Sequence, residues 1–275
     1  MTAGAGRSAL PGFRLSLGIS LVWLSLIVLL PLTALALRPW ELGVAGVWQS
    51  VTEPRVLAAL RLSFGGAAIA AAINTPVGLL IAWVMARYRF PFRRLADAMI
   101  DLPLALPTAV AGIALTALFA PQGWIGGLLF PLGITIAYTP AGVMLAMVFV
   151  GLPFVVRTVE PVLLDLPADV EEAAATLGAT RAQVIWRVEL PAIGPAVLAG
   201  FGAALARAVG EYGSVIFIAG NMPMRSEIAP LLIVIRLEQF GYAGAAALAL
   251  AMLLLSFLLL LALNLAVRAL RPAEA

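Results

Sequence analysis

The stretch LDLPADVEEAAATLGATRAQVIWRVELP, residues 164–191, decides how this chain folds, because it places adjacent acids and a run of alanines between strongly apolar segments. Pro167 suits the first turn of a helix, and the carboxylates of Glu171 and Glu172 favour the positive end of its dipole. Gly178 fits the left-handed position that closes a helix. The sequence therefore predicts a short helix between Pro167 and Gly178.

A second short helix is predicted directly after the first. Thr180 begins it, and Gln183, three residues later, is the partner that a capping box requires. Pro191 is expected to end it, because proline lacks the backbone N–H that a helix interior needs. The two helices would form a polar hairpin.

The first predicted helix has one shallow apolar face. Val170, Ala173, Ala174 and Leu177 recur at the spacing of a single helical stripe, and both acids are expected on the water-facing side. Alanines at this spacing let another surface approach closely, so a partner protein could bind there. The alternative is a hairpin that packs on the inner ends of the chain's own helices.

Composition indicates an integral membrane protein. Of the 275 residues, 63% are hydrophobic and 11% are charged, whereas an average soluble domain has about 25% charged residues. The chain has no lysine, histidine or cysteine, which excludes a Walker A site, thiolate or imidazole metal sites and Ser-His-Asp triads. We therefore expect no catalytic centre, metal or cofactor, and the net charge of +3 suits membrane topology better than nucleic-acid binding.

Six apolar stretches are long enough to cross the bilayer, which takes about 20 residues each. The predicted fold is an all-α, polytopic membrane protein with six transmembrane helices. The apolar patch at 228–235 is too short to cross and is expected to lie re-entrant or flat at the outer surface. The six predicted spans are 15–37, 60–85, 98–119, 139–156, 196–219 and 243–267.

The arginines orient this bundle, because basic residues near the spans favour the cytoplasm. Most arginines lie in the segments that precede the first span, follow the second and fourth spans, and follow the last span. Both termini are therefore expected in the cytoplasm. The first apolar run is interpreted as a retained helix rather than a cleaved signal peptide, since no small-residue cleavage site follows it. The predicted division is an N-terminal segment with one span (1–57), a five-helix core (58–267) with a cytoplasmic loop (157–195), and a tail (268–275).

Charged and helix-breaking residues inside two spans mark a candidate pathway. Arg207 and Glu211 are four residues apart, so they share a helix face and can pair, either as a structural ion pair or beside a substrate. In the third span Asp101, Pro103 and Pro107 interrupt the helix, and Thr108 adds a hydroxyl donor. Such breaks often mark transport pathways, although a simple proline kink is the alternative.

The hairpin resembles the EAA loop of permeases in ATP-binding-cassette (ABC) importers. That pattern is E-A-A, three residues, G, nine residues, a branched aliphatic residue, one residue, then L-P. The matching positions here are Glu172, Ala173, Ala174, Gly178, Val188, Leu190 and Pro191.

The resemblance implies a type I ABC importer permease fold in the bacterial inner membrane. It also implies that the loop, with Glu171, Glu172, Ala173, Ala174, Gly178, Leu190 and Pro191, docks into a separate ATPase subunit. ATP would then be hydrolysed outside this chain, in agreement with the absence of lysine.

Further strings resemble one branch of these permeases, the sulfate/thiosulfate family. They include RYRFPFRRLADAMIDLPLALPTAVAG (87–112) and GEYGSVIFIAGN (210–221). The resemblance implies two copies of an ATPase, a second homologous permease subunit and a periplasmic sulfate- or thiosulfate-binding protein. Permeases for molybdate or another oxyanion are the nearest alternative. An ATP-independent transporter or channel, and a membrane enzyme or scaffold, are the alternatives from other classes.

Overall fold

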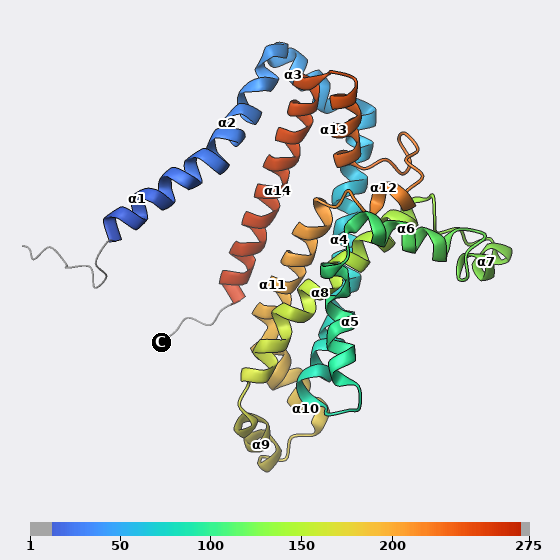
Figure 1. Cartoon of the computed structure of the whole chain (residues 1–275). Helices are drawn as coiled ribbons and strands as arrows, with labels where there is room; N and C mark the ends of the chain where they lie inside the picture. Colours follow the sequence, from blue (N-terminus) through green and yellow to red (C-terminus); the bar gives the residue numbers. More distant parts are fainter. Residues whose placement is uncertain (1–12, 271–275) are drawn as a thin grey trace, which may run out of the picture.

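The computed structural model describes residues 13–270, and within that range the chain is helical and contains no strand. Three long helices form the centre of a bundle: α4 (Pro54–Arg87), α8 (Pro140–Asp165) and α11 (Leu190–Val209). Each packs against the other two, and α14 (Tyr242–Leu270) lies against α11 (Figure 1). The predicted all-helical class is confirmed. Arg7 and Arg271, two of the arginines used to orient the chain, lie outside the described residues.

Small side chains let the three central helices approach closely. A methyl group built on Gly78 of α4 would lie 2.7 Å from the Cβ of Val155 in α8. A methyl group on Gly200 of α11 would lie 3.2 Å from the Cα of the same valine. Because lipid is as apolar as a protein core, helices in a bilayer associate through close packing of this kind. Val155 is therefore enclosed by α4 and α11.

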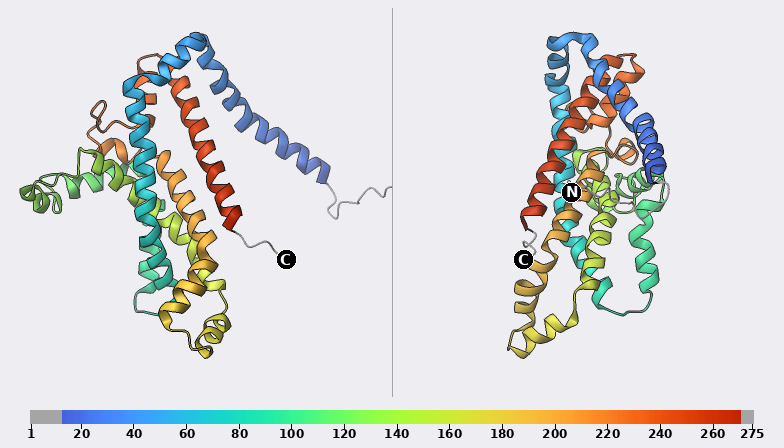
Figure 2. Two further views of the ribbon diagram at one scale, coloured as in Figure 1. Left: turned by 180° about the vertical axis from the view of Figure 1, so that it is seen from behind. Right: turned by 90° about the vertical axis from the view of Figure 1, so that its left-hand side faces the viewer.

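The N-terminal helices leave the bundle as a separate arm. The arm comprises α1 (Phe13–Leu24), η1 (Ser25–Leu29), α2 (Leu30–Leu37), η2 (Arg38–Leu42) and α3 (Gly43–Thr52). It joins the bundle near α3, and α1 diverges from α14 in Figure 1 and in the left view of Figure 2. In its most apolar window, 0% of the residues are buried. The predicted first span is helical, but its apolar surface is uncovered in this chain.

Within residues 13–270, five helices are long and apolar enough to cross a membrane, or six if one bent pair counts as a single span. The bent pair is α5 (Arg93–Ala105) and α6 (Thr108–Phe119), whose axes differ by 109°. The third predicted span is therefore two helices with a sharp corner. The number of candidate spans equals the predicted six only when α5 and α6 together are counted as one span.

Three predicted helix boundaries are wrong. The helix of the fourth span continues to Asp165, and the helical segment of the fifth span already begins at Arg181, so the predicted cytoplasmic loop 157–195 includes parts of both helices. The fifth span ends at Val209 rather than at 219, because a turn at Gly210 separates it from α12 (Val215–Ile218). Apolar composition continues across this turn, which is why the hydropathy pattern did not reveal it.

Short helices complete the chain. The segment α7 (Gly126–Leu129) and η3 (Phe130–Leu132) projects sideways from the bundle beyond α6 (Figure 1). The predicted non-spanning patch forms α13 (Ala229–Glu238), which has 10 residues and packs against α14 and α4. Its length agrees with the prediction that it does not cross the membrane.

Candidate functional site

The predicted hairpin lies at one end of the bundle, below α8 and α11 in Figure 1. Its first helix is α9 (Ala168–Thr176), with Pro167 at the N-cap, one position before the first turn where it was predicted. Gly178 has φ +83°, the left-handed conformation predicted for it. The helix end is closed by bonds from the Gly178 N–H to the Ala175 carbonyl (2.9 Å) and from the Ala179 N–H to the Ala174 carbonyl (3.1 Å).

The start of the second helix, α10 (Arg181–Val184), is also confirmed. The Thr180 hydroxyl accepts from the Gln183 N–H at 3.4 Å, and the Gln183 side chain accepts from the Thr180 N–H at 2.8 Å, which completes the capping box.

The predicted end of this helix at Pro191 is wrong. The helix continues through the π-turn η4 (Ile185–Glu189) into α11, so that Arg181–Val209 is one 29-residue helical segment. Proline clashes with the carbonyl four residues earlier, and a wider π-turn at that place removes the conflict. The N-terminal arm repeats the arrangement, with η1 immediately before α2 and its Pro31.

The two adjacent acids of α9 point in different directions. Glu172 is exposed as predicted, and so are Ala173 and Leu177, the latter with 89% of its surface accessible. The prediction that both acids face water is wrong for Glu171, whose side chain is 18% exposed. Glu171 instead forms an ion pair with Arg87 at the end of α4, at 2.6 Å. The outward face of the hairpin therefore carries Glu172, Ala173 and Leu177, whereas Ala174 is half-buried.

Glu171 belongs to a cluster of four charged residues, which we name the hairpin charge cluster: Arg87, Glu171, Arg181 and Glu189. Arg181 Nη1 donates to Glu171 Oε2 at 3.1 Å and lies 3.9 Å from Glu189 Oε1. The Glu189 side chain is 0% exposed, and its two oxygens accept no hydrogen bond from the described residues. The cluster is not predictable from local sequence, because Arg87 is far from the other three residues in the chain.

Asp101, one of the predicted pathway residues, lies in α5 and pairs with Arg157 of α8. The guanidinium contacts both carboxylate oxygens, and it also lies 2.8 Å from Asp97 and 3.1 Å from Glu160. Arg157 falls in the predicted loop 157–195, whereas in the structure it lies within α8. Glu160, three residues later in the same apolar segment, was the available sequence signal for a buried charged group.

The two prolines of the third span have different places. Pro103 is buried within α5, whereas Pro107 is the N-cap of α6, at the corner between the helices. The backbone at Leu106 is extended, as expected for a residue that precedes proline. The break predicted from these residues is confirmed, and Pro107 lies at its centre.

Thr108 begins α6 and lies against the turn that follows α11. A methyl group on Gly213 would overlap the Thr108 hydroxyl, and one on Gly112 would overlap the Ser214 carbonyl. Within the turn, Glu211 Oε1 accepts from the N–H and the hydroxyl of Ser214, each at 2.8 Å. The broken third span is thereby packed directly on the GEYGS string.

Arg207 and Glu211 form the predicted ion pair, with Nη1 2.6 Å from Oε2. The Glu211 side chain is 2% exposed and lies just beyond the end of α11, while that of Arg207 is 29% exposed. The structure thus brings Thr108 beside the turn that contains Glu211, and it places Asp101 in a separate ion-pair group with Arg157.

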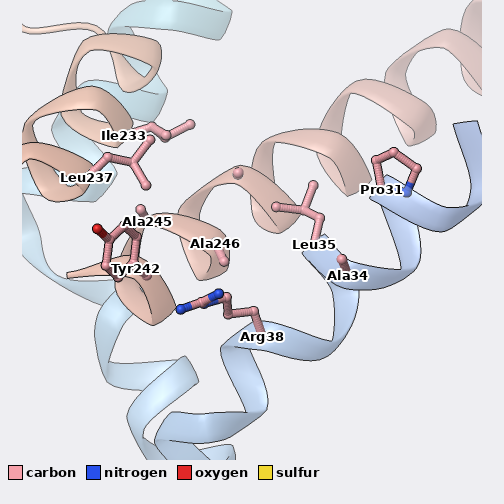
Figure 3. A pocket seen from close by; sticks show the side chains of 10 residues that line it. Pro31, Ala34, Leu35, Arg38, Ile233, Leu237, Tyr242, Ala245 and Ala246 are labelled. Carbon is pink, nitrogen blue, oxygen red and sulfur yellow. The ribbon is translucent and has the colours of Figure 1, made fainter. Parts of the chain in front are cut away.

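At the opposite end of the molecule, the arm meets the bundle around a pocket of about 350 Å³ between α2, α13 and α14 (Figure 3). The Arg38 guanidinium lies over the Tyr242 ring, 5.1 Å from its centroid. The rest of the lining is mainly aliphatic, including Leu35, Ile233 and Leu237. This contact attaches the α2 end of the arm to the bundle, whereas α1 extends away from it.

The exposed hairpin, the broken third span and the bundle of spanning helices define a multi-pass membrane permease. The chain belongs to the family described as binding-protein-dependent transport system inner membrane component, whose sequence model matches residues 74–273. It is therefore a multi-pass protein of the inner membrane, and its family consists of transport subunits rather than catalytic enzymes.

Individual relatives are more specific. The chain is 48% identical over 248 residues to the sulfate transport system permease protein CysT of Salmonella typhimurium, with 90% of each chain covered. It is 50% identical over 227 residues to the protein of the same name from Synechococcus elongatus, with 82% of each chain covered. The predicted resemblance to the sulfate permease family is confirmed.

Solved structures agree on the fold. A bacterial alginate ABC transporter in complex with an alginate pentasaccharide-bound periplasmic protein contains a chain with a TM-score of 0.75 and 16% identity, covering 91% of this chain and 92% of that one. The MetNI methionine ABC transporter in an inward-facing conformation gives a TM-score of 0.61 and 18% identity, covering 80% and 100%. The predicted type I ABC importer permease fold is confirmed.

Proposed function

We propose that this chain is the membrane-spanning permease subunit of an ATP-driven importer that carries sulfate or thiosulfate into the cell. The observation that carries the proposal is the outward-facing α9, which presents Glu172 and Ala173 in the register of the EAA loop. The 48% identity to a sulfate transport system permease supports the substrate class.

A separate ATPase, present in two copies, would bind at this surface. Glu172, Ala173 and Gly178 are the proposed contact residues, and all three are exposed. The alanine face is shallow, so a helix-binding groove on the partner could approach it closely. In this proposal α9 and both termini lie in the cytoplasm, which the distribution of arginines supports. Leu190 and Pro191, the first two residues of α11, would connect the hairpin to this helix.

A second permease subunit would cover the arm. The apolar window of the arm has no buried residue within this chain, although helices in a bilayer gain from packing against one another. We assign residues 58–267 to the permease core and the arm to contact with the second subunit. A periplasmic sulfate- or thiosulfate-binding protein would deliver the substrate at the opposite end from α9.

The pathway would pass the corner between α5 and α6, near the turn that contains Glu211. Thr108 offers a hydroxyl and Arg207 a partly exposed cation, which Glu211 offsets. A dianion needs donors along its route, but many unpaired arginines would hold it too tightly for release. Selectivity would then come mainly from the external binding protein.

Uptake of radiolabelled sulfate tests the substrate. A strain that lacks its own sulfate permease would be complemented with this chain and its partner subunits, with thiosulfate and molybdate as competitors. Uptake that thiosulfate reduces and molybdate leaves unchanged is the expected result. Competition by molybdate alone would contradict the proposed substrate.

Purification in mild detergent tests the docking surface. A tagged complex should retain the ATPase, and Glu172→Arg or Gly178→Arg should lose it. Asp165→Asn, an exposed carboxylate at the end of α8, is the matched control. Retention of the ATPase by both hairpin variants would count against docking at α9.

A further inference from the structure

The hairpin charge cluster joins three helical segments at the base of the hairpin. Arg87 is the last residue of α4, Glu171 lies in the first turn of α9, Arg181 begins α10, and Glu189 closes η4 directly before α11. Glu171 contacts both arginines, at 2.6 Å and 3.1 Å. One carboxylate of α9 therefore connects the ends of two central helices.

Glu171 is also the main polar attachment of α9 to the bundle. Among the side chains of α9 that the structure describes, Glu171 and Ala174 are half-buried and the others are exposed. Ala174 offers a single methyl group, whereas Glu171 offers two charged contacts. Without these ion pairs, α9 would be connected to the spans mostly by its flanking backbone.

Glu171 is the member of the cluster that connects α9 to the spans. Arg181 and Glu189 belong to one helical segment, Arg181–Val209, so they stay together if α9 moves. Arg87 lies at the end of α4, and its ion-pair partner among the described residues is Glu171. A mostly buried charge is unfavourable when its compensating partner leaves. Detachment of α9 would leave Arg87 without this carboxylate, so the cluster is most stable when α9 and the ends of the two helices stay together.

We infer that Glu171 is a positioning residue that transmits the displacement of α9 to α4 and to the α10–α11 segment, through Arg87 and Arg181. The inference rests on the proposed docking of an ATPase at α9. Adjacent residues of a helix differ by about 100° in direction. Glu172 therefore faces the partner while Glu171 faces the spans, and the two neighbouring acids perform the two halves of one coupling step.

Transport per ATP hydrolysed is the quantity that tests this role. In the full complex reconstituted in liposomes, Glu171→Gln should retain the ATPase and continue to hydrolyse ATP, while sulfate transported per ATP falls by about 2-fold to 30-fold. Arg87→Gln should act in the same direction. The exchange Arg87→Glu with Glu171→Arg should recover part of the loss that either single change causes. Asp165→Asn should resemble the unaltered protein.

The outcomes separate this inference from the proposed function. Unchanged transport per ATP in Glu171→Gln and Arg87→Gln would overturn the linkage. Loss of the ATPase in Glu171→Gln would also overturn it, because Glu171 would then act in docking. If Glu172→Arg retains the ATPase, the proposed docking itself fails.

A distance measurement covers the case in which the variants do not fold. The chain has no cysteine, so Arg89→Cys, two residues beyond the end of α4, and Thr176→Cys on α9 can be spin-labelled as a single pair. Both positions are exposed. In the complex, the distance should stay the same when nucleotide is added, because α9 and α4 move together. A distance that changes with nucleotide would overturn the inference.

Discussion

Arg157 of α8 binds both carboxylate oxygens of Asp101 on α5, with Nε 2.8 Å from Oδ1 and Nη2 2.7 Å from Oδ2. A bidentate contact fixes direction as well as distance. Because Asp97 and Glu160 also lie beside the guanidinium, a single cation holds three carboxylates. The contact attaches α5 to α8 just before the chain turns by 109° into α6.

Arg157→Ala should lower stability, because it leaves Asp97, Asp101 and Glu160 close together without a cation. The side chain of Asp101 is 47% exposed, so water screens part of the effect and we expect a loss of about 1 to 2 kcal/mol. The apparent melting temperature in detergent measures it. The melting temperature of Arg157→Lys should lie between those of the unaltered protein and Arg157→Ala, since lysine keeps the charge but loses the bidentate geometry. An unchanged melting temperature in the alanine variant would show that the contact contributes nothing.

Local signals were the part of the site that sequence alone predicted well. The capping box of Thr180 and Gln183 and the left-handed Gly178 depend on residues within one turn of each other, so their geometry follows from the local sequence. The exposure of Glu172 follows from helical spacing. The pairing of Arg207 with Glu211 was predicted from the same spacing, and it forms although Glu211 lies just beyond the end of α11. The number of spans follows from hydropathy, except at the bend.

Features that depend on distant packing were not predictable in this way. Pro191 would end an isolated helix, but the π-turn before it lets the chain continue into α11. Glu171 looked water-facing by periodicity, yet Arg87, 84 positions earlier, attracts it to the bundle. The turn at Gly210 is hidden because the residues on both sides are apolar. Asp101 could be recognised as unusual, but its partner on α8 could not.

The ion pair of Arg207 and Glu211 should have two separable effects, one on stability and one on sulfate uptake. In Arg207→Ala the Glu211 carboxylate remains buried without its cation, which we expect to cost about 3 kcal/mol of stability. The double change Arg207→Ala with Glu211→Gln should recover most of this, because a glutamine oxygen still accepts from Ser214. Sulfate uptake should remain low in the double variant, since the pathway has lost its cation. Thermal stability and uptake, measured on the same preparations, decide the outcome; full recovery of uptake would make the pair structural only.

Gly112 should tolerate no side chain. A methyl group there would overlap the Ser214 carbonyl and lie 2.8 Å from the Ser214 Cα, so α6 would have to move off the turn. Because the Ser214 backbone cannot shift without loss of packing, we expect Gly112→Ala to lower the free energy of unfolding by about 1 to 3 kcal/mol. Gly65→Ala is the matched control, because a methyl group there meets no atom within 4 Å. Melting temperatures that fall equally in both variants would contradict the close approach of α6 to the turn.

Gly178 should be limited by backbone conformation rather than by space. Its φ of +83° is unfavourable for residues with a side chain, although a methyl group built there meets no atom within 4 Å. Gly178→Ala should therefore weaken the end of α9 by about 1 kcal/mol, and Gly178→Asn by less, because asparagine tolerates the left-handed region. A β-branched residue is the least compatible with this conformation, so Gly178→Val should have the largest effect. Retention of the ATPase during purification should follow the order Gly, Asn, Ala, Val if α9 must keep its shape to be bound. The contradicting outcome is that Gly178→Asn and Gly178→Ala lose the ATPase equally, although spin-label mobility shows that α9 remains helical in both. The partner would then require a surface without a side chain at this position, and the effect would be steric.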